Sequence, residues 1–352
     1  MKTYNILLAL SFALLLFVFG CGNDDTTVQP EEEAIERPND SIPDLDPDPN
    51  PDPNTDPDPD PESDKITPLG GVDFNGLSDG QSITALVDYW GTYGNGCGSQ
   101  GDTNIKRPGK TSSANMSIQA GTTGRPGDGT PAGNGDFGFI LTLNDKGHNI
   151  TEGEEFWMGT WLFIPEDFEF KSGTATLKFI RFAMPTGGKV ETQIMGVGAA
   201  NSTGFFLGSE AYPQRQEFTH RDTESVLIRG EWNFVSIYIK ASVDQDKSVH
   251  RVWVNDQFAM EHVGNTSDVT TKWLDPDGAL QTQTWVPTSG NGGKWAILDE
   301  SSVLHSIFLF TYWNSNSPKD QSINVQELFY LKDGTNLATD EYGNKYIKSD
   351  QL

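Results

Sequence analysis

The feature that most constrains the fold of this chain is a succession of short β-rich runs separated by clusters of Gly, Asn, Asp and Pro, with almost no helical periodicity between them. Examples are Phe156 to Ile164 (FWMGTWLFI), Trp232 to Ala241 (WNFVSIYIKA) and Ile323 to Leu331 (INVQELFYL). Several runs are apolar or aromatic on both faces, which suits two stacked sheets whose outer surfaces carry further contacts. We see no internal repeat of propeller length. The pattern predicts an all-β chain, most economically a β-sandwich of the jelly-roll type.

A hairpin is expected at Val254 to Phe258 (VNDQF), because Asn and Asp tolerate positive φ in a tight turn. The folded domain is expected to run from residue 67 to residue 352, which is long enough for one substantial core.

The first 20 residues differ from everything that follows. Lys2 precedes an almost unbroken apolar run, Ile6 to Phe19, which ends at Gly20 and Cys21. A charge, a short apolar stretch and a small residue in this order are typical of a secretory signal, and the run is too short to be a stable membrane span. An ordinary signal peptide followed by a chance cysteine is the simpler alternative to any special role for Cys21.

Residues 21–66 form an acidic linker. Asp44 to Pro61 reads DLDPDPNPDPNTDPDPDP, and residues 23–65 hold sixteen acidic side chains against Arg37 and Lys65. Proline removes amide donors and the aspartates repel one another, so this stretch cannot build a packed core. We expect an extended stalk of the polyproline type, rather than a calcium-binding tract.

The formal net charge of −26 opposes binding to nucleic acid, and no basic stripe compensates for it. Apart from Cys21 there is one other cysteine, Cys97, so no disulfide framework supports the domain. The five histidines are scattered without zinc-site spacing. No cofactor is expected to be required. The acidic excess leaves a structural Ca²⁺ possible, although no loop is specific enough to name.

Val18 to Cys21 resembles the lipobox of bacterial lipoproteins, in which the cysteine is acylated and becomes the new N-terminus. Asn23-Asp24-Asp25 resembles the acidic export signal of surface lipoproteins in Bacteroidetes-type bacteria. The resemblance implies a lipid anchor on Cys21, including palmitate, in the outer membrane, with the domain facing the cell surface. Facing the periplasm is the alternative.

The order of strands also carries a resemblance. Glu154 to Gly159, followed by Trp161 to Phe168 (WLFIPEDF), resembles the strand and "IPEDF" corner of heparin-lyase-like polysaccharide lyase domains. Thr176 to Arg181 looks like the strand that follows there. Gly230 to Val235 and Val252 to Asn255 resemble paired strands of concanavalin A-like sandwiches. The resemblance covers about half of the chain and implies a concanavalin A-like jelly roll that handles carbohydrate, as a monomer.

Such lyases cleave uronic-acid polysaccharides by β-elimination. This reaction needs a group that neutralises the C5 carboxylate, a base for the C5 proton and an acid for the departing O4. The resemblance implies Lys178 and Tyr312 as catalytic residues, with Arg181 and Gln193 binding substrate. Strand alternation places Lys178 and Arg181 on opposite faces unless a bulge intervenes. Gln193 resembles the first residue of the "Q-I-H" strand of jelly-roll alginate lyases, but Met195 replaces the histidine, so either Lys178 or another histidine is the base, or catalysis is lost.

Further candidate residues for binding an anionic glycan come from one loop and one pair of strands. The loop from Tyr212 to Glu224 offers cationic groups, and two neighbouring strands interleave aromatic side chains with polar ones, as sugar-binding surfaces do. The candidate substrate-binding residues from these places are Arg215, His220, Arg221, Tyr238, Arg251 and Trp253. Salt bridges in a solvated loop and core packing of Trp253 are the structural alternatives.

Two functions remain open. The first is a polysaccharide lyase acting on an anionic polymer of the ulvan, alginate or glucuronan class. The second is a non-catalytic glycan-binding lipoprotein of the cell surface, which the missing histidine after Gln193 would suit. A glycoside hydrolase is discounted because Glu152, Glu154 and Glu155 lie at a strand entrance rather than within a strand.

Overall fold

A computed structural model describes most of the domain that follows the acidic linker. The described residues are 65–87, 99–121, 138–169, 177–186, 189–197, 205–210, 218–220, 227–275, 277–287, 296–298, 303–309 and 317–351, and in 177–179, 183–186, 189–197, 205–210 and 218–220 only the backbone is described. The expected signal peptide, Cys21 and nearly all of the linker lie outside these residues. Ile66 donates its amide to the carbonyl of Gln351 at 2.9 Å, so the folded domain already includes the last residue assigned to the linker.

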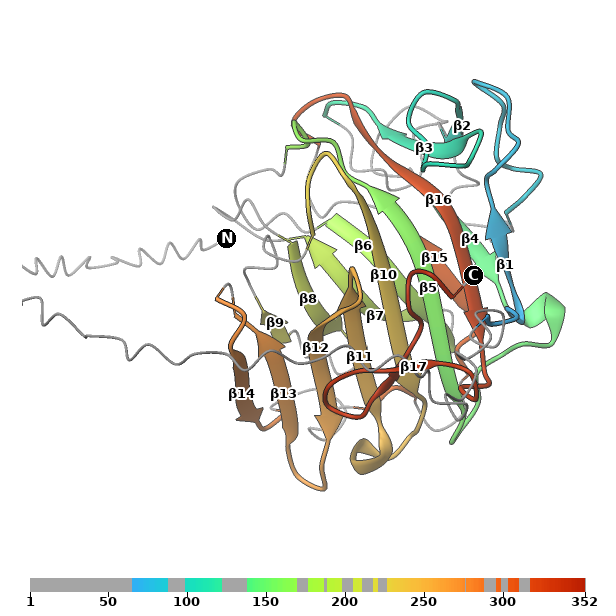
Figure 1. Cartoon of the computed structure of the whole chain (residues 1–352). Coiled ribbons are helices and arrows are strands. Elements are labelled where there is room, and N and C mark those ends of the chain that lie inside the picture. Colours follow the sequence, from blue (N-terminus) through green and yellow to red (C-terminus); the bar gives the residue numbers. More distant parts are fainter. Residues whose placement is uncertain are drawn as a thin grey trace, which may run out of the picture. The chain divides into compact units, whose positions relative to one another are not determined.

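The larger sheet is antiparallel and has ten described strands in the order β14-β13-β12-β11-β10-β5-β16-β3-β2, with β1 paired to β16 beside β3. Figure 1 shows β10, β5 and β16 at its centre. Its strands are β1 (Gly70–Asp73), β2 (Gln100–Asp102), β3 (Ser113–Ile118), β5 (Glu155–Phe163), β10 (Trp232–Lys240), β11 (Val249–Val254), β12 (Gln257–Gly264), β13 (Val269–Leu274), β14 (Leu280–Trp285) and β16 (Gln321–Leu331).

The smaller sheet has six described strands in the order β4-β15-β6-β7-β8-β9, all antiparallel. Its strands are β4 (Phe139–Thr142), β6 (Leu177–Thr186), β7 (Lys189–Val197), β8 (Phe205–Glu210), β9 (Phe218–His220) and β15 (Ser306–Leu309). A two-stranded sheet, β17 (Ala338–Thr339) and β18 (Lys345–Tyr346), follows near the C-terminus, and the described helices are the 3₁₀ turns η1 (Asn144–Lys146) and η2 (Gln245–Lys247).

The main core lies between the two sheets. Phe156 of β5 contacts Phe182 of β6 edge to face, with ring centroids 5.9 Å apart, and both belong to one apolar cluster. Aromatic pairs of this geometry add to the burial of apolar area that holds stacked sheets together. The all-β jelly-roll sandwich predicted from the sequence is therefore confirmed.

A second apolar cluster lies on the outer face of the larger sheet. Trp157, Tyr238 and Trp253 belong to it, together with Tyr346 and Ile347 from the C-terminal segment. Residues 332–351 thus cover part of this face. This covering explains why the central strands are apolar on both sides.

The predicted hairpin is confirmed: Asn255 and Asp256 have φ of 51° and 64° between β11 and β12. Within the described residues, no helix has the length and apolar character needed to cross a membrane.

Candidate functional site

The outer face of the smaller sheet carries a buried arginine. Ile180 and Phe182 of β6 belong to the core between the sheets, so Arg181 lies on the opposite face. Its register partner on β15 is Phe308, and the guanidinium carbon lies 5.3 Å from the ring centroid. Arg181 is 4% exposed and Phe308 is fully buried. The contact holds the cation against an aromatic face and limits its motion.

A β-bulge brings Lys178 to the face of Arg181. On β7, Lys178 pairs with Gly196 and Arg181 pairs with Ile194, whereas Phe179 has no partner in the ladder. Gly196 and Ile194 are two residues apart and therefore share a face, so their partners share it too. The extra residue removes the conflict that strict alternation predicts, as a bulge does by re-aiming the side chains that follow it. Both cationic positions of β6 are thus on one face of the sheet.

Gln193 and His220 have register positions on the other face. Gln193 pairs with Phe182, whose side chain belongs to the core. His220 pairs with Leu207, which pairs with Met195, which pairs with Ile180. The backbone therefore does not bring Gln193 and His220 to the face of Lys178 and Arg181. Met195 has the same register as His220, so a histidine at that position would not have joined this face either.

Four predicted site residues, Tyr312, Arg215, Arg221 and Cys21, lie outside the described residues. Their roles remain predictions. Phe308, by contrast, is not among the residues expected from the sequence, although it lies directly opposite Arg181. Phe308 precedes Tyr312 by four residues in an aromatic run (HSIFLFTYW). This even spacing is the sequence feature from which Phe308 could have been predicted to share a face with Tyr312.

The structure corrects the prediction of an open sugar-binding face around Trp253. Trp253 is fully buried, donates from Nε1 to Asp340 Oδ2 at 2.9 Å, and stacks on Tyr346 with ring centroids 5.5 Å apart. A sugar ring cannot reach a side chain that the C-terminal segment covers in this way. The alternative of core packing holds for Trp253.

Tyr238 and Arg251 are committed to protein partners on the same face. The Tyr238 hydroxyl donates to Glu155 Oε1 at 2.7 Å. Burial raises the pKa of the Tyr238 phenol, and the hydrogen bond to Glu155 acts in the same direction. Arg251 Nε donates to Glu261 Oε2, and Glu261 also pairs with Lys272 at 3.1 Å. These residues form a structural network on the larger sheet, away from Lys178 and Arg181.

Among the described side chains, no group of three or more His, Cys, Asp and Glu residues is placed to hold a metal ion. The possible Ca²⁺ site therefore remains a prediction without assigned ligands. On the described part of the smaller sheet, two register positions of the outer face are occupied by the cationic residues Lys178 and Arg181, and Arg181 lies beside the ring of Phe308. Arg181 is a cation on this face, and a guanidinium group is suited to pair with a carboxylate.

No protein-family model matches the chain, and no curated protein does. Among solved structures it is similar to the alginate lyase Aly36B, with 13% identity over 74% of this chain and 96% of that one and a TM-score of 0.47. It is also similar to an endo-β-1,4-glucuronan lyase from the fungus Trichoderma reesei, with 14% identity, coverage of 77% and 98%, and a TM-score of 0.45. The alginate lyase vAL-1 from Chlorella virus has 12% identity, coverage of 76% and 100%, and a TM-score of 0.43. Likenesses of this size assign no activity to this chain.

Proposed function

We propose that this protein is a polysaccharide lyase that cleaves a uronic-acid-containing anionic polysaccharide, of the ulvan, alginate or glucuronan class, by β-elimination on the outer face of its smaller sheet. The observation that carries the proposal is the bulge at Phe179, which gives Lys178 and Arg181 register positions on one face. Binding and activating a uronate requires a group that neutralises the carboxylate and a base on the same face, and these two residues are suited to those roles.

In this proposal the positive charge of Arg181, which is 4% exposed, acts from beneath the substrate and stabilises the negative charge that develops on the C5 carboxylate. Lys178 acts as the base that removes the C5 proton. A base must be a neutral amine, and like charge between Lys178 and Arg181 would disfavour the ammonium form. The electrons of the C5–H bond form the C4–C5 double bond as the C4–O4 bond breaks, and O4 receives a proton from an acid.

Tyr312 is the proposed acid. It follows Phe308 by four residues, and unbroken alternation would assign both residues to one face. In the described part of β15, which runs antiparallel to β6, Phe308 is opposite Arg181 and Leu309 is opposite Ile180. The spacing thus supports a constellation of Lys178, Arg181 and Tyr312.

The decisive experiment offers the full chain alginate, glucuronan and ulvan and follows the ultraviolet absorbance of the unsaturated uronate product. We expect absorbance to rise with one polymer, to be lost in Lys178→Ala and Tyr312→Phe, and to persist in Lys247→Ala, whose exposed side chain pairs with Asp244. A flat trace with all three polymers and folded protein would overturn the proposal.

Non-catalytic glycan binding is the second candidate. The position of Gln193 favours it, because Gln193 pairs with Phe182 and so has its register position on the face away from Lys178 and Arg181. The proposed site therefore lacks the glutamine that the resemblance to lyases would have bind substrate. Retarded migration of the protein in gels containing one of the polymers, without any product, would identify this function.

The proposed location is the outer membrane, with a lipid on Cys21 and the domain carried outward on the acidic stalk. Incorporation of labelled palmitate into the full chain, and its loss in Cys21→Ala, would test the anchor. Protease digestion of intact cells would separate a surface orientation from a periplasmic one.

A further inference from the structure

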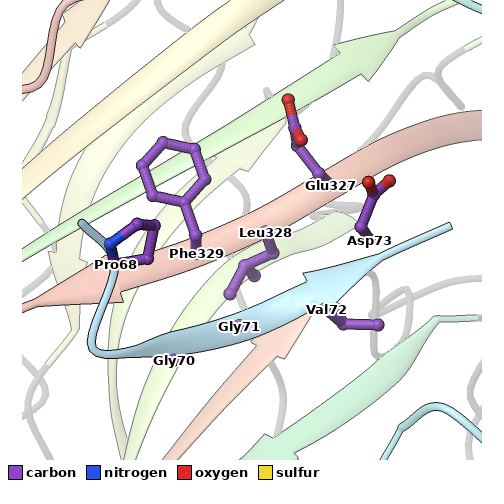
Figure 2. A pocket seen from close by; sticks show the side chains of 8 residues that line it. All are labelled: Pro68, Gly70, Gly71, Val72, Asp73, Glu327, Leu328 and Phe329. Atoms are coloured by element: carbon purple, nitrogen blue, oxygen red, sulfur yellow. The ribbon is translucent and has the colours of Figure 1, made fainter. Parts of the chain in front are cut away.

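A crevice opens on the outer face of the larger sheet, between β1 and β16, with a volume of about 230 Å³. Figure 2 shows its lining: Phe329, Glu327, Asp73 and Pro68 project to one side of the strand pair, and Gly70 and Gly71 form a stretch of β1 without side chains. Val72 and Leu328 belong instead to the core between the sheets. The crevice is therefore separate from the proposed catalytic face, which is the outer surface of the other sheet.

Two carboxylates, Asp73 and Glu327, line one end of the crevice, and both belong to a cluster of four charged side chains whose cations, Arg107 and Lys110, are not among the lining residues. Glu327 Oε1 accepts from Arg107 Nη1 at 2.7 Å, and Glu327 Oε2 lies 3.4 Å from Lys110 Nζ. Lys110 also lies 3.4 Å from Asp73 Oδ2. The side chain of Asp73 is 48% exposed, so its carboxylate is accessible from the crevice side.

The charges of this cluster cancel, since two carboxylates face one guanidinium and one ammonium group. The lining carboxylates disfavour an anion, and their pairing with Arg107 and Lys110 removes the net attraction for a cation. A neutral ligand rich in hydroxyl groups meets no such penalty, because each hydroxyl can donate to a carboxylate. The electrostatics of the crevice thus disfavour an anionic ligand and give no net advantage to a cationic one.

The other end is apolar. Pro68 and the small exposed part of Phe329, which is 5% exposed, form its wall, and backbone runs along its side at Gly70 and Gly71. A bulky side chain cannot replace these glycines easily: a Cβ at Gly70 would lie 2.4 Å from the Tyr330 hydroxyl, and one at Gly71 would lie 2.3 Å from the Leu328 carbonyl oxygen. The proline ring beside open backbone offers an apolar surface for the C–H face of a saturated ring. The volume is smaller than the roughly 300 Å³ or more of pockets for drug-sized ligands and suits one ring.

We propose that this crevice is a second carbohydrate-binding site, which binds one neutral pyranose unit, with its C–H face against Pro68 and the backbone of Gly70 and Gly71 and its hydroxyls on Asp73 and Glu327. A site of this kind does no chemistry. It would hold a neutral glycan, or a neutral sugar of a mixed polymer, on the face of the domain opposite the proposed catalytic face. The proposal does not depend on lyase activity, and a failed elimination assay would leave it standing.

The test is a titration of the isotope-labelled full chain with methyl glucoside, methyl mannoside, methyl galactoside and methyl xyloside, followed by amide chemical shifts in NMR. We expect the amides of Gly70, Gly71 and Val72 to shift and saturate with at least one of these sugars. Asp73→Asn should weaken that binding by about tenfold, because a hydrogen bond to a charged acceptor is lost. Asp145→Asn, at an exposed carboxylate in η1, is the matched control and should leave binding unchanged.

Glu327→Gln serves as a second variant, and thermal unfolding of each variant establishes that it is folded. Saturating shifts at Gly70 to Val72 that weaken in Asp73→Asn or Glu327→Gln, but not in Asp145→Asn, would support the site. Three results would each overturn it: no shift at these amides up to the solubility limit of all four sugars, equal shifts in all variants, or binding of methyl glucuronoside as tight as that of the neutral sugars.

Discussion

Arg181 and Phe308 lie directly opposite each other on β6 and β15, with the guanidinium carbon 5.3 Å from the ring centroid. Neither is in the core between the sheets, yet both are buried. A buried guanidinium is costly unless its surroundings compensate for lost hydration, and an aromatic face supplies part of that compensation. This pair therefore fixes the position of the cation on which the proposed substrate binding depends.

The first prediction is that Arg181 and Phe308 are energetically coupled. In a double-mutant cycle with Arg181→Met and Phe308→Leu, the free energy of unfolding should show a coupling of about 0.5–2 kcal/mol, the range of cation–π contacts that are partly desolvated. Urea denaturation of the four proteins measures it. Strict additivity of the two single changes would show that the contact has no energetic weight.

The second prediction concerns acid stability. His250 and His262 pair across β11 and β12, are both buried, and have ring centroids 6.2 Å apart. Burial lowers the pKa of His250 to about 4, and burial followed by the charge of His250 lowers that of His262. Because the unfolded state binds the proton more readily, stability is complete above the ordinary histidine pKa of about 6.5 and falls as the pH drops toward about 4.

For His250 alone, the free energy of unfolding should be about 2 kcal/mol lower at pH 5 than at pH 7. Urea denaturation at these two pH values measures the loss, above the range in which exposed carboxylates titrate. His250→Leu should reduce the loss without abolishing it, since His262 remains. An unchanged pH dependence in His250→Leu would contradict the assignment.

A third prediction follows from the close approach of backbone and rings at Gly159. A Cβ there would lie 2.5 Å from Phe329 Cζ and 2.8 Å from Phe234 Cζ. Gly159→Ala should therefore lower the free energy of unfolding by about 1–3 kcal/mol, the usual cost of overpacking. Equilibrium unfolding is the measurement, and a neutral or stabilising effect would show that the rings move aside at no cost.

The sequence predicts more of the fold than of the candidate site. Alternation and turn residues suffice for the sandwich and for the hairpin at Asn255 and Asp256, because these depend on local chemistry. The bulge at Phe179 does not follow from the sequence, since the apolar run around Lys178 offers no break in pattern that would mark an extra residue. Its position emerges only when β6 is paired with β7.

The burial of Trp253 is a different kind of failure. Residues 332–351 are mostly polar, yet Leu337, Tyr346 and Ile347 pack against the outer face of the larger sheet. Three apolar anchors spread over eleven positions give no periodic signal. Whether a sheet face is covered depends on contacts with residues far away in the sequence. The local sequence around an aromatic residue on that face is the same whether the residue is exposed to solvent or covered.

The fourth prediction tests this covering segment. Asp340 accepts from Trp253 Nε1 at 2.9 Å and from the amides of Tyr342 and Asn344 at 3.0 and 2.8 Å. Asp340→Ala would leave the buried indole N–H without this acceptor and would open the turn between β17 and β18. We expect the free energy of unfolding to fall by about 2 kcal/mol or more, as for other hydrogen bonds to charged groups.

Asp350→Ala is the matched control for Asp340→Ala, because Asp350 forms an exposed ion pair with Lys348 and such pairs contribute about 0–1 kcal/mol. Urea denaturation, with tryptophan fluorescence as the readout, compares the two variants and reports directly on the environment of the indoles. If Asp340→Ala lowered the free energy of unfolding no more than Asp350→Ala does, the C-terminal segment would be only weakly packed on the sheet. Trp253 would then become accessible to ligands, and its role as a sugar-binding residue would have to be reconsidered.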